Sequence, residues 1–387
     1  MKKSALAVAV LGAFAGAAYA QSSVTMFGIV DLNFRYVNND ETAYSLSQDG
    51  DASSRLGFRG VEDLGGGLKA SFWLEAAIGP DTGRGGASYG NGTTSTSIPC
   101  GALPGCPASG AVTISNENAF MFQRRATLSL SHDKWGEVRL GRDYTPQFWN
   151  WAVFDPFGFN GIGSAGNIMT AVANVGVTGA SYGTLVRANN AVQYILPNGV
   201  FGPGLYGNAM VSAGESDIGN KMWGLRVGYA AGPFNIAASY SDTDLDVATL
   251  FNMTQWNIAG SWDFGQFGKI SGLYAQFRAD GPWATGPMGD RGQDNWFIGY
   301  SVPIGKFGVR ASYGQVSGSG NVAPNSRDAT QFAIGGTYDM SKRTRFYATA
   351  SWIQNDPASA FRVANTGSGL TAGENSNGFE IGVRHSF

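Results

Sequence analysis

The stretch Val24-Thr-Met-Phe-Gly-Ile-Val-Asp-Leu-Asn-Phe-Arg-Tyr36 decides the fold class. Its side chains alternate strictly, which is typical of a β-strand with one apolar and one polar face. The apolar face carries Val24, Met26, Val30, Leu32, Phe34 and Tyr36, with Gly28 among them. The polar face carries Thr25, Asp31, Asn33 and Arg35.

The same two-residue period repeats to the end of the chain, and a helical period is not seen. Short turns rich in Gly, Pro and Asn alternate with long loops, so all turns should lie at one end of the sheet and all loops at the other. About sixteen strands are predicted, at residues 24–36, 54–61, 68–75, 122–131, 137–144, 190–196, 205–212, 222–229, 234–241, 256–264, 269–278, 295–302, 307–315, 331–340, 344–353 and 379–387.

The composition excludes several classes of protein. Charged residues make up 14% of the 387 residues, against roughly 25% in an average soluble protein. Aromatic residues make up 13%, so the chain does not resemble a disordered one. The 26 basic and 28 acidic residues form no basic block, which argues against nucleic-acid binding.

The first twenty residues have the pattern of a secretory signal peptide. Lys2 and Lys3 precede an apolar stretch, and Ala18-Tyr-Ala20 forms a small-x-small cleavage site. The apolar stretch is too short to span a bilayer. We therefore expect residues 1–20 to be removed and residues 21–387 to form a single exported domain.

The apolar faces carry aromatic residues near their ends, as in Trp256 with Trp262 and Trp296 with Tyr300. Aromatics at both ends of a strand suit the two interfaces of a membrane. A soluble β-sandwich would place more Lys and Glu on its polar faces. Since lipid cannot satisfy an open sheet edge, a spanning sheet must close, and sixteen strands leave a water-filled lumen. The sequence predicts an all-β fold, a 16-stranded antiparallel transmembrane β-barrel.

Four blocks of sequence resemble the trimeric general porins of Gram-negative outer membranes, and most closely their β-proteobacterial branch. The blocks are Ser23–Asp31, Ser54–Lys69, Leu140–Pro146 and Gly378–Phe387. The resemblance implies a homotrimer in contact with outer-membrane lipid and lipopolysaccharide. It also implies that the last strand, ending in Phe387, is read by the barrel-insertion machinery as an assembly signal.

The resemblance further implies that the third long loop, from about Thr145 to Leu185, folds into the barrel and faces basic residues on the wall. By motif, the basic residues are Arg55, Arg59 and Arg142, with Arg187 a weaker match. Strict alternation with Val138 and Leu140 would turn Arg142 outward, unless a bulge redirects it. The acidic candidates are Asp155 on the loop and Asp143, and removal of the Asp155 charge is expected to strengthen anion preference.

Other candidate sites are few. Cys100 and Cys106 lie six residues apart in an exported chain, so a disulfide that closes a short loop is expected in preference to a metal pair. Asp242, Asp244 and Asp246 alternate like Ca²⁺ ligands but lack the Gly and Glu of a Ca²⁺ loop; a solvated loop, or divalent ions that bridge to lipopolysaccharide, remain as alternatives.

Two matches to the hydrolase pattern Gly-x-Ser-x-Gly, at residues 86–90 and 179–183, lie in Gly-rich loops. The serine of this pattern acts as a nucleophile only on a sharp turn between a strand and a helix, which these loops do not offer. No enzyme, cofactor or resident metal is expected. The predicted function is passive diffusion of small hydrophilic solutes and ions through an outer-membrane channel that prefers anions. A substrate-selective channel and an outer-membrane adhesin are the alternatives.

Overall fold

The computed structural model describes residues 23–85, 96–99, 111–114, 122–169, 184–214, 221–247, 250–280, 291–320, 328–364 and 370–387. The predicted signal peptide (1–20) and the predicted Cys100–Cys106 disulfide lie outside these residues. The strands are β1 (Ser23–Asn38), β2 (Thr42–Gln48), β3 (Arg55–Gly65), β4 (Leu68–Gly79), β5 (Arg84–Gly85), β6 (Thr96–Pro99), β7 (Ala111–Ile114), β8 (Arg125–His132), β9 (Gly136–Tyr144), β10 (Arg187–Ile195), β11 (Leu205–Ser212), β12 (Lys221–Ala231), β13 (Phe234–Val247), β14 (Leu250–Asp263), β15 (Lys269–Asp280), β16 (Arg291–Ile304), β17 (Phe307–Gly320), β18 (Ala329–Asp339), β19 (Thr344–Asn355) and β20 (Ser376–Ser386). The helices are α2 (Pro146–Phe154), α3 (Gly166–Met169) and the 3₁₀ turn η3 (Gly265–Phe267).

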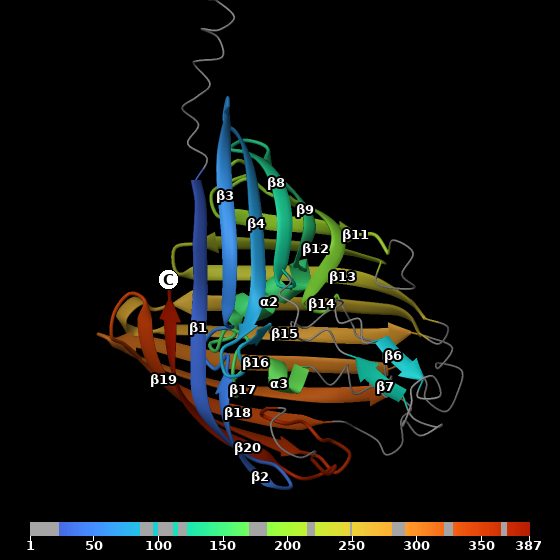
Figure 1. The fold of residues 1–387 in the computed structure, drawn as a ribbon, viewed down its shortest axis with the longest axis vertical. Coiled ribbons are helices and arrows are strands. Elements are labelled where there is room, and N and C mark those ends of the chain that lie inside the picture. The colour runs from blue at the N-terminus through green and yellow to red at the C-terminus, as the bar shows by residue number, and fades with distance from the viewer. Residues whose placement is uncertain are drawn as a thin grey trace, which may run out of the picture.

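Eighteen of these strands form one antiparallel sheet that closes on itself (Figure 1). The closure is the pairing of β1 with β20, which runs from Ile29 opposite Ser386 to Asn38 opposite Asn377. The short β5 is an appendage of β4, and β2 shares one barrel position with β3. Without these two, 18 − 2 = 16 strands make the barrel wall, which confirms the predicted fold.

The strand position beside β1 is split. β3 pairs with the first half of β1, Ser23 to Ile29, and β2 pairs with its second half, Leu32 to Asn38. Residues 49–54 interrupt the strand between them. The alternation in this part of the sequence therefore belongs to one broken strand, whose β2 half was not predicted.

The two faces of the wall differ as predicted. On β10, Val192 and Tyr194 are exposed on the outer surface, whereas Gln193 between them is 2% exposed. The exposed large hydrophobic side chains include Val24, Met26, Trp256, Trp262 and Trp296. An apolar outer band with aromatic residues suits lipid, and a polar inner face suits a water-filled lumen.

The loop between β9 and β10 contains α2 and α3, which the sequence analysis did not predict. Pro146 is the first residue of α2, a position where its missing N–H costs no hydrogen bond. Six of the nine α2 residues are buried, so the helix has no polar face that a periodicity search would find. No helix in the described ranges is long and apolar enough to cross a membrane.

Inward-facing side chains of the wall hold this loop. Asn257 on β14 accepts a hydrogen bond from Asn150 at 2.7 Å. The Gln293 side chain on β16 donates to the Ile168 carbonyl oxygen at 3.1 Å, and Gln331 on β18 donates to the Ser164 carbonyl at 3.1 Å. The loop thus lies against the inner face of β12–β18, as α2 and α3 show in Figure 1.

The expectation that Asp242, Asp244 and Asp246 lie in a solvated loop is wrong, because all three fall within β13. Asp242 and Asp244 lie within β13 and pair with Trp223 and Lys221 of β12. They are strand residues because β13 extends six residues beyond the apolar alternation that predicted its end at Ser241.

Candidate pore constriction

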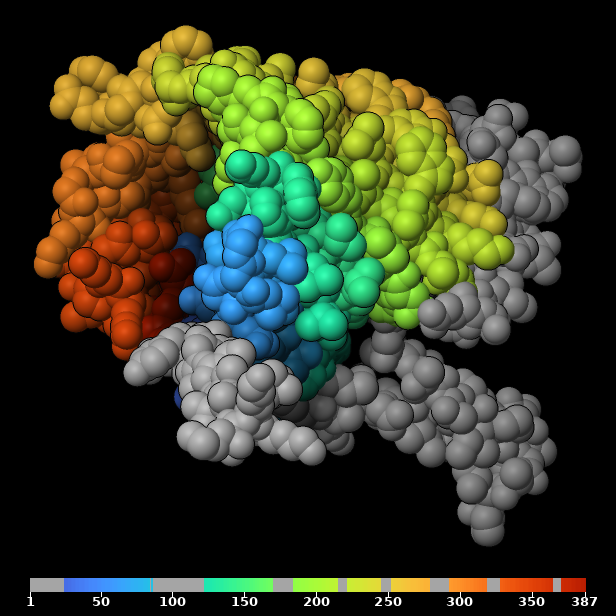
Figure 2. Space-filling view, turned by 90° about the horizontal axis from the view of Figure 1, so that it is seen from above, coloured from blue at the N-terminus to red at the C-terminus, as the bar shows by residue number. Residues whose placement is uncertain are grey.

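The loop from Thr145 covers one side of the lumen and leaves the wall formed by β3, β4, β8 and β9 facing it. In Figure 2 the surface is hollowed between the residues of β3 and β8, in blue and teal, and those of the last strands, in orange and red. Arginine residues gather on and beside this wall. We call the following six the basic wall: Arg55, Arg59, Arg124, Arg125, Arg139 and Arg187.

Arg55 and Arg59 both project from the inner face of β3. The Arg55 side chain is 26% exposed and lies 3.5 Å from the Glu75 carboxylate. Arg59 is exposed, and its guanidinium lies over the rings of Phe27 and Trp73, at 5.5 and 5.3 Å from their centroids. Such cation–π contacts hold an arginine in place without neutralising it. No carboxylate in the described ranges pairs with Arg59.

Glu75 joins Arg55 to Arg187 through a chain of contacts. Arg124 Nε donates to the Glu75 carboxylate at 2.6 Å, and its Nη2 donates to the Tyr144 hydroxyl at 2.7 Å. Arg187, 3% exposed, donates to the same hydroxyl at 2.7 Å. The structure therefore brings Arg55 and Arg187, two of the candidate residues, into one network, with Arg124 as a link that was not predicted.

A second pair of unpredicted arginines completes the basic wall. Arg139 donates to the Asp143 carboxylate at 2.6 Å, and Arg125 lies 3.6 Å from the same carboxylate. The Arg125 guanidinium also lies 4.6 Å from the Trp73 ring centroid, on the ring that Arg59 contacts. The alternation of side chains along the strand places Arg139 inward, on the face opposite to Val138 and Leu140. The sequence alone could therefore have identified it.

Arg142 lies apart from Arg55 and Arg59. It pairs in register with Ala126, and its guanidinium is hydrogen-bonded to the Gln123 carbonyl oxygen and the Asn189 side chain. The neighbouring strand β10 has a bulge between Ala188 and Ala191. The contacts tie Arg142 to the wall, where its charge is close enough to interact with that of Arg187.

Asp155 has a different environment from the one expected of an acidic pore residue. It is 4% exposed, and its carboxylate accepts the backbone N–H groups of Phe157, Phe159 and Ala165 at 3.0, 3.0 and 3.1 Å. Burial raises its pKa to about 6, against the stabilising effect of these three donors. Asp155 organises the loop and does not present its oxygen atoms to the basic wall.

The charge balance of the basic wall is positive. Arg55, Arg59, Arg124, Arg125, Arg139 and Arg187 supply six positive charges, and Glu75, Asp143 and Glu137 supply three negative ones. The difference is 6 − 3 = +3. The predicted Asp143 is one of these acids, but it is an ion-pair partner on the wall and is 1% exposed.

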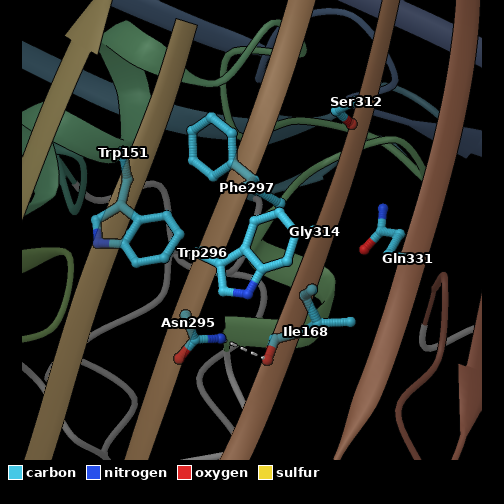
Figure 3. Close-up of a pocket in the computed structure, with 9 residues that line it drawn as sticks. Trp151, Ile168, Asn295, Trp296, Phe297, Ser312, Gly314 and Gln331 are labelled. Atoms are coloured by element: carbon cyan, nitrogen blue, oxygen red, sulfur yellow. Dashed lines mark hydrogen bonds between the residues drawn. The ribbon is translucent and has the colours of Figure 1, made fainter.

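A small pocket lies behind the loop, where it meets β16–β18 (Figure 3). Trp151 and Ile168 come from the loop side, and Phe297 and Gln331 from the wall. Asn295 donates to the Ile168 carbonyl oxygen at 3.1 Å. This pocket anchors the loop and contains no group of the basic wall.

Phe387 completes the strand closure. Its backbone exchanges two hydrogen bonds with Gly28, each 3.1 Å long. Its ring occupies the space that a side chain at position 28 would fill. The predicted role of Phe387 as an assembly signal stays a prediction.

Comparison with known proteins identifies the family. Residues 5–358 match the family described as Gram-negative porin. The chain is 35% identical to outer membrane porin protein 32 of Delftia acidovorans over the full length of both, and 29% identical to a Bordetella pertussis outer membrane porin, again over both full lengths. The solved anion-selective porin of Comamonas acidovorans superposes with a TM-score of 0.77 at 31% identity, over 95% of this chain and all of that one. An outer membrane protein of Vibrio cholerae shares the fold at 14% identity, with a TM-score of 0.64 and 96% of this chain covered. The closed barrel, its inward-facing arginines and these matches together show that the chain belongs to the Gram-negative porin family.

Proposed function

We propose that this porin is a channel for passive diffusion of small hydrophilic solutes and ions that prefers anions. The protein is an outer-membrane β-barrel of a family of channels. The observation that carries the preference is the basic wall, with a net charge of +3 and with Arg59 exposed and without a carboxylate partner in the described part of the chain.

The physical basis is electrostatic. In a narrow pore a fixed positive charge attracts anions and repels cations, and its effect is stronger than in bulk water because the low-dielectric wall limits screening. The Comamonas acidovorans relative is described as anion-selective, which supports the same preference here. Selection then depends on pore width and wall charge, with no catalysis and no energy source.

The remaining parts of the proposal concern maturation and assembly. Removal of residues 1–20 leaves one barrel domain, residues 21–387, and Cys100 and Cys106 form a disulfide in the oxidising periplasm. The barrel assembles as a homotrimer in contact with lipid and lipopolysaccharide, after Phe387 and the last strand have been read by the insertion machinery. One solved Vibrio cholerae outer membrane protein with this fold is described as a trimer form.

The test of anion preference is the reversal potential of single channels in a planar bilayer under a KCl gradient. We expect chloride to permeate more readily than potassium in the wild type. Replacing both Arg55 and Arg59 by Ser removes two charges from the wall and should enlarge the conductance and reduce or reverse the preference.

A matched control is the double variant Lys306→Ser and Arg343→Ser, which loses two positive charges at exposed turns. Its permeability ratio should change less than that of the wall variant. A wild-type reversal potential that shows potassium preference contradicts the proposed anion selectivity and leaves the family assignment unchanged.

A further inference from the structure

The broken strand between β2 and β3 places one aspartate, Asp51, inside the barrel. Asp31 on β1 accepts the backbone N–H groups of Asp51 and Ala52 at 2.9 and 2.8 Å. Asp49, with a left-handed φ of 64°, accepts the N–H of Ser54 at 2.6 Å. These contacts fix the turn that interrupts the strand, so the inward position of Asp51 is built into the fold.

Asp51 faces three arginines from three different strands. Its carboxylate lies 3.0 Å from Arg310 on β17, 2.8 Å from Arg384 on β20 and 3.7 Å from Arg345 on β19. The Asp51 side chain is 1% exposed, whereas those of Arg345 and Arg384 are 28% and 23% exposed. We call Asp51 and these three arginines the Asp51 cluster. The carboxylate of the cluster is shielded from water, whereas the side chains of Arg345 and Arg384 are partly exposed.

The arginines would repel one another without this carboxylate. Arg345 and Arg384 stand directly opposite in the β19–β20 register, an arrangement that is unfavourable for like charges. Asp339 partly compensates Arg345, at 2.6 Å, but its side chain is 45% exposed. Arg310 Nε and Nη2 and Arg384 Nε have no hydrogen-bond partner within the described chain. The cluster therefore holds more donors and more positive charge than its acids compensate.

The Asp51 cluster lies at a different place from the basic wall. Arg345 is the second residue of β19 and comes just after the turn that joins β18 to β19. The cluster therefore lies toward the turn end of the barrel. The Arg310 guanidinium also lies 4.5 Å from the ring centroid of Phe157 on the inward loop. The cluster thus connects the turn-side lumen to the loop that covers the opposite wall.

We propose that Asp51 is a specificity-determining residue of the channel, whose buried charge limits what the arginines of the turn-side lumen add to the anion preference. The proposal rests on the proposed channel function but concerns the change caused by Asp51, whatever the sign of the wild-type preference. Counting only the side chains in these ion pairs, Arg310, Arg345 and Arg384 against Asp51 and Asp339 give a local charge of 3 − 2 = +1. Removal of the Asp51 charge makes it +2.

The experiment is the reversal potential in a KCl gradient at about 0.1 M salt, where the Debye length is about 10 Å and a charge in the lumen acts across much of the pore. Asp51→Asn keeps the side-chain size, and we expect the chloride-to-potassium permeability ratio to rise about twofold. The control Asp133→Asn makes the same charge change at a side chain that is 71% exposed on a turn, and it should change the ratio little.

A rescue variant separates a charge effect from a structural one. Asp51→Asn combined with Arg384→Gln restores the local charge to +1, and its permeability ratio should return close to the wild-type value. Arg384→Gln alone lowers the local charge to 0 and should reduce the ratio, which gives a reading even where Asp51→Asn fails to assemble. Assembly is checked by the change in SDS gel migration on heating.

The inference is overturned if an assembled Asp51→Asn channel has an unchanged or lower permeability ratio, or if the double variant keeps the raised one. A wild-type channel that prefers potassium contradicts the proposed function instead. In that case Asp51→Asn should still shift the ratio toward chloride relative to the wild type, so the two failures are distinguishable.

Discussion

Asp155 is a carboxylate whose identity was foreseen from the sequence and whose role was not. The sequence offers it as the acid on an otherwise uncharged loop, but the chain turns back so that three backbone N–H groups reach its oxygen atoms. A buried carboxylate with three donors stabilises a turn. We therefore expect Asp155→Asn to change ion selectivity little, in contrast to the increase expected from the sequence.

The raised pKa of Asp155 predicts a pH dependence of the loop. Its pKa is about 6 in the folded loop and 3.8 in the reference state, so between pH 4 and 6 the folded loop retains a proton that the opened loop has lost. The free energy of opening therefore falls as pH rises through this range, by about 3 kcal/mol when fully developed. Hydrogen exchange at the amides of Phe157, Phe159 and Ala165, corrected for intrinsic rates, should show less protection at pH 7 than at pH 4. Asp155→Asn should abolish the dependence; equal protection of the wild type at both pH values would contradict it.

The arginines show which site residues a sequence can reveal. Arg55 and Arg59 follow from alternation, because a strand with lipid on one side has only one face for a charge. Arg124 lies just before β8 and acts through Glu75, Tyr144 and Arg187, which are contacts between distant parts of the chain. No spacing of residue types encodes them, and the same holds for the Asp51 cluster.

At the scale of elements, the strands were predictable and the interruptions were not. The predicted strand Leu205–Ser212 coincides with β11, because lipid outside and water inside impose a two-residue period on the whole wall. The sequence of β2 alternates too, but the break at residues 49–54 hides that it continues β3. Helix α2 was missed because protein surrounds it and its residues are apolar on most sides.

The closure of β1 on the C-terminus makes Gly28 a sensitive position. A methyl group there would overlap the Phe387 ring and lie 2.7 Å from the Arg55 carbonyl oxygen. Because backbone on one side cannot yield, Gly28→Ala should lower the free energy of unfolding by about 1–3 kcal/mol. Urea titration followed by SDS gel migration measures it. The control is Gly336→Ala, whose added methyl group meets no atom closer than 3.9 Å. Equal stability of the two variants would show that the closure of β1 on the C-terminus tolerates the methyl group.

For the whole molecule, the chain carries nearly balanced charge but distributes it unevenly. Its net charge is −2, whereas the basic wall has +3 and the Asp51 cluster with Asp339 has +1. The inner loop is held by side-chain amides of the wall across the lumen from the basic wall, which bond to backbone carbonyl oxygen atoms and the Asn150 side chain of the loop. The charge that faces the lumen is thus positive although the net charge of the chain is negative. Selectivity depends on the local electrostatic field in the lumen.

This distribution predicts how selectivity depends on salt. The Debye length falls from about 10 Å at 0.1 M to about 3 Å at 1 M, and Arg59 is exposed to the lumen solution, so mobile ions screen it. The chloride-to-potassium permeability ratio should fall toward the ratio of the bulk mobilities as the mean KCl concentration is raised at a constant gradient. The variant that lacks Arg55 and Arg59 should show a weaker dependence, because fewer unpaired charges remain to be screened. A ratio that stays constant between 0.1 and 1 M would mean that pore width, and not wall charge, sets the selectivity.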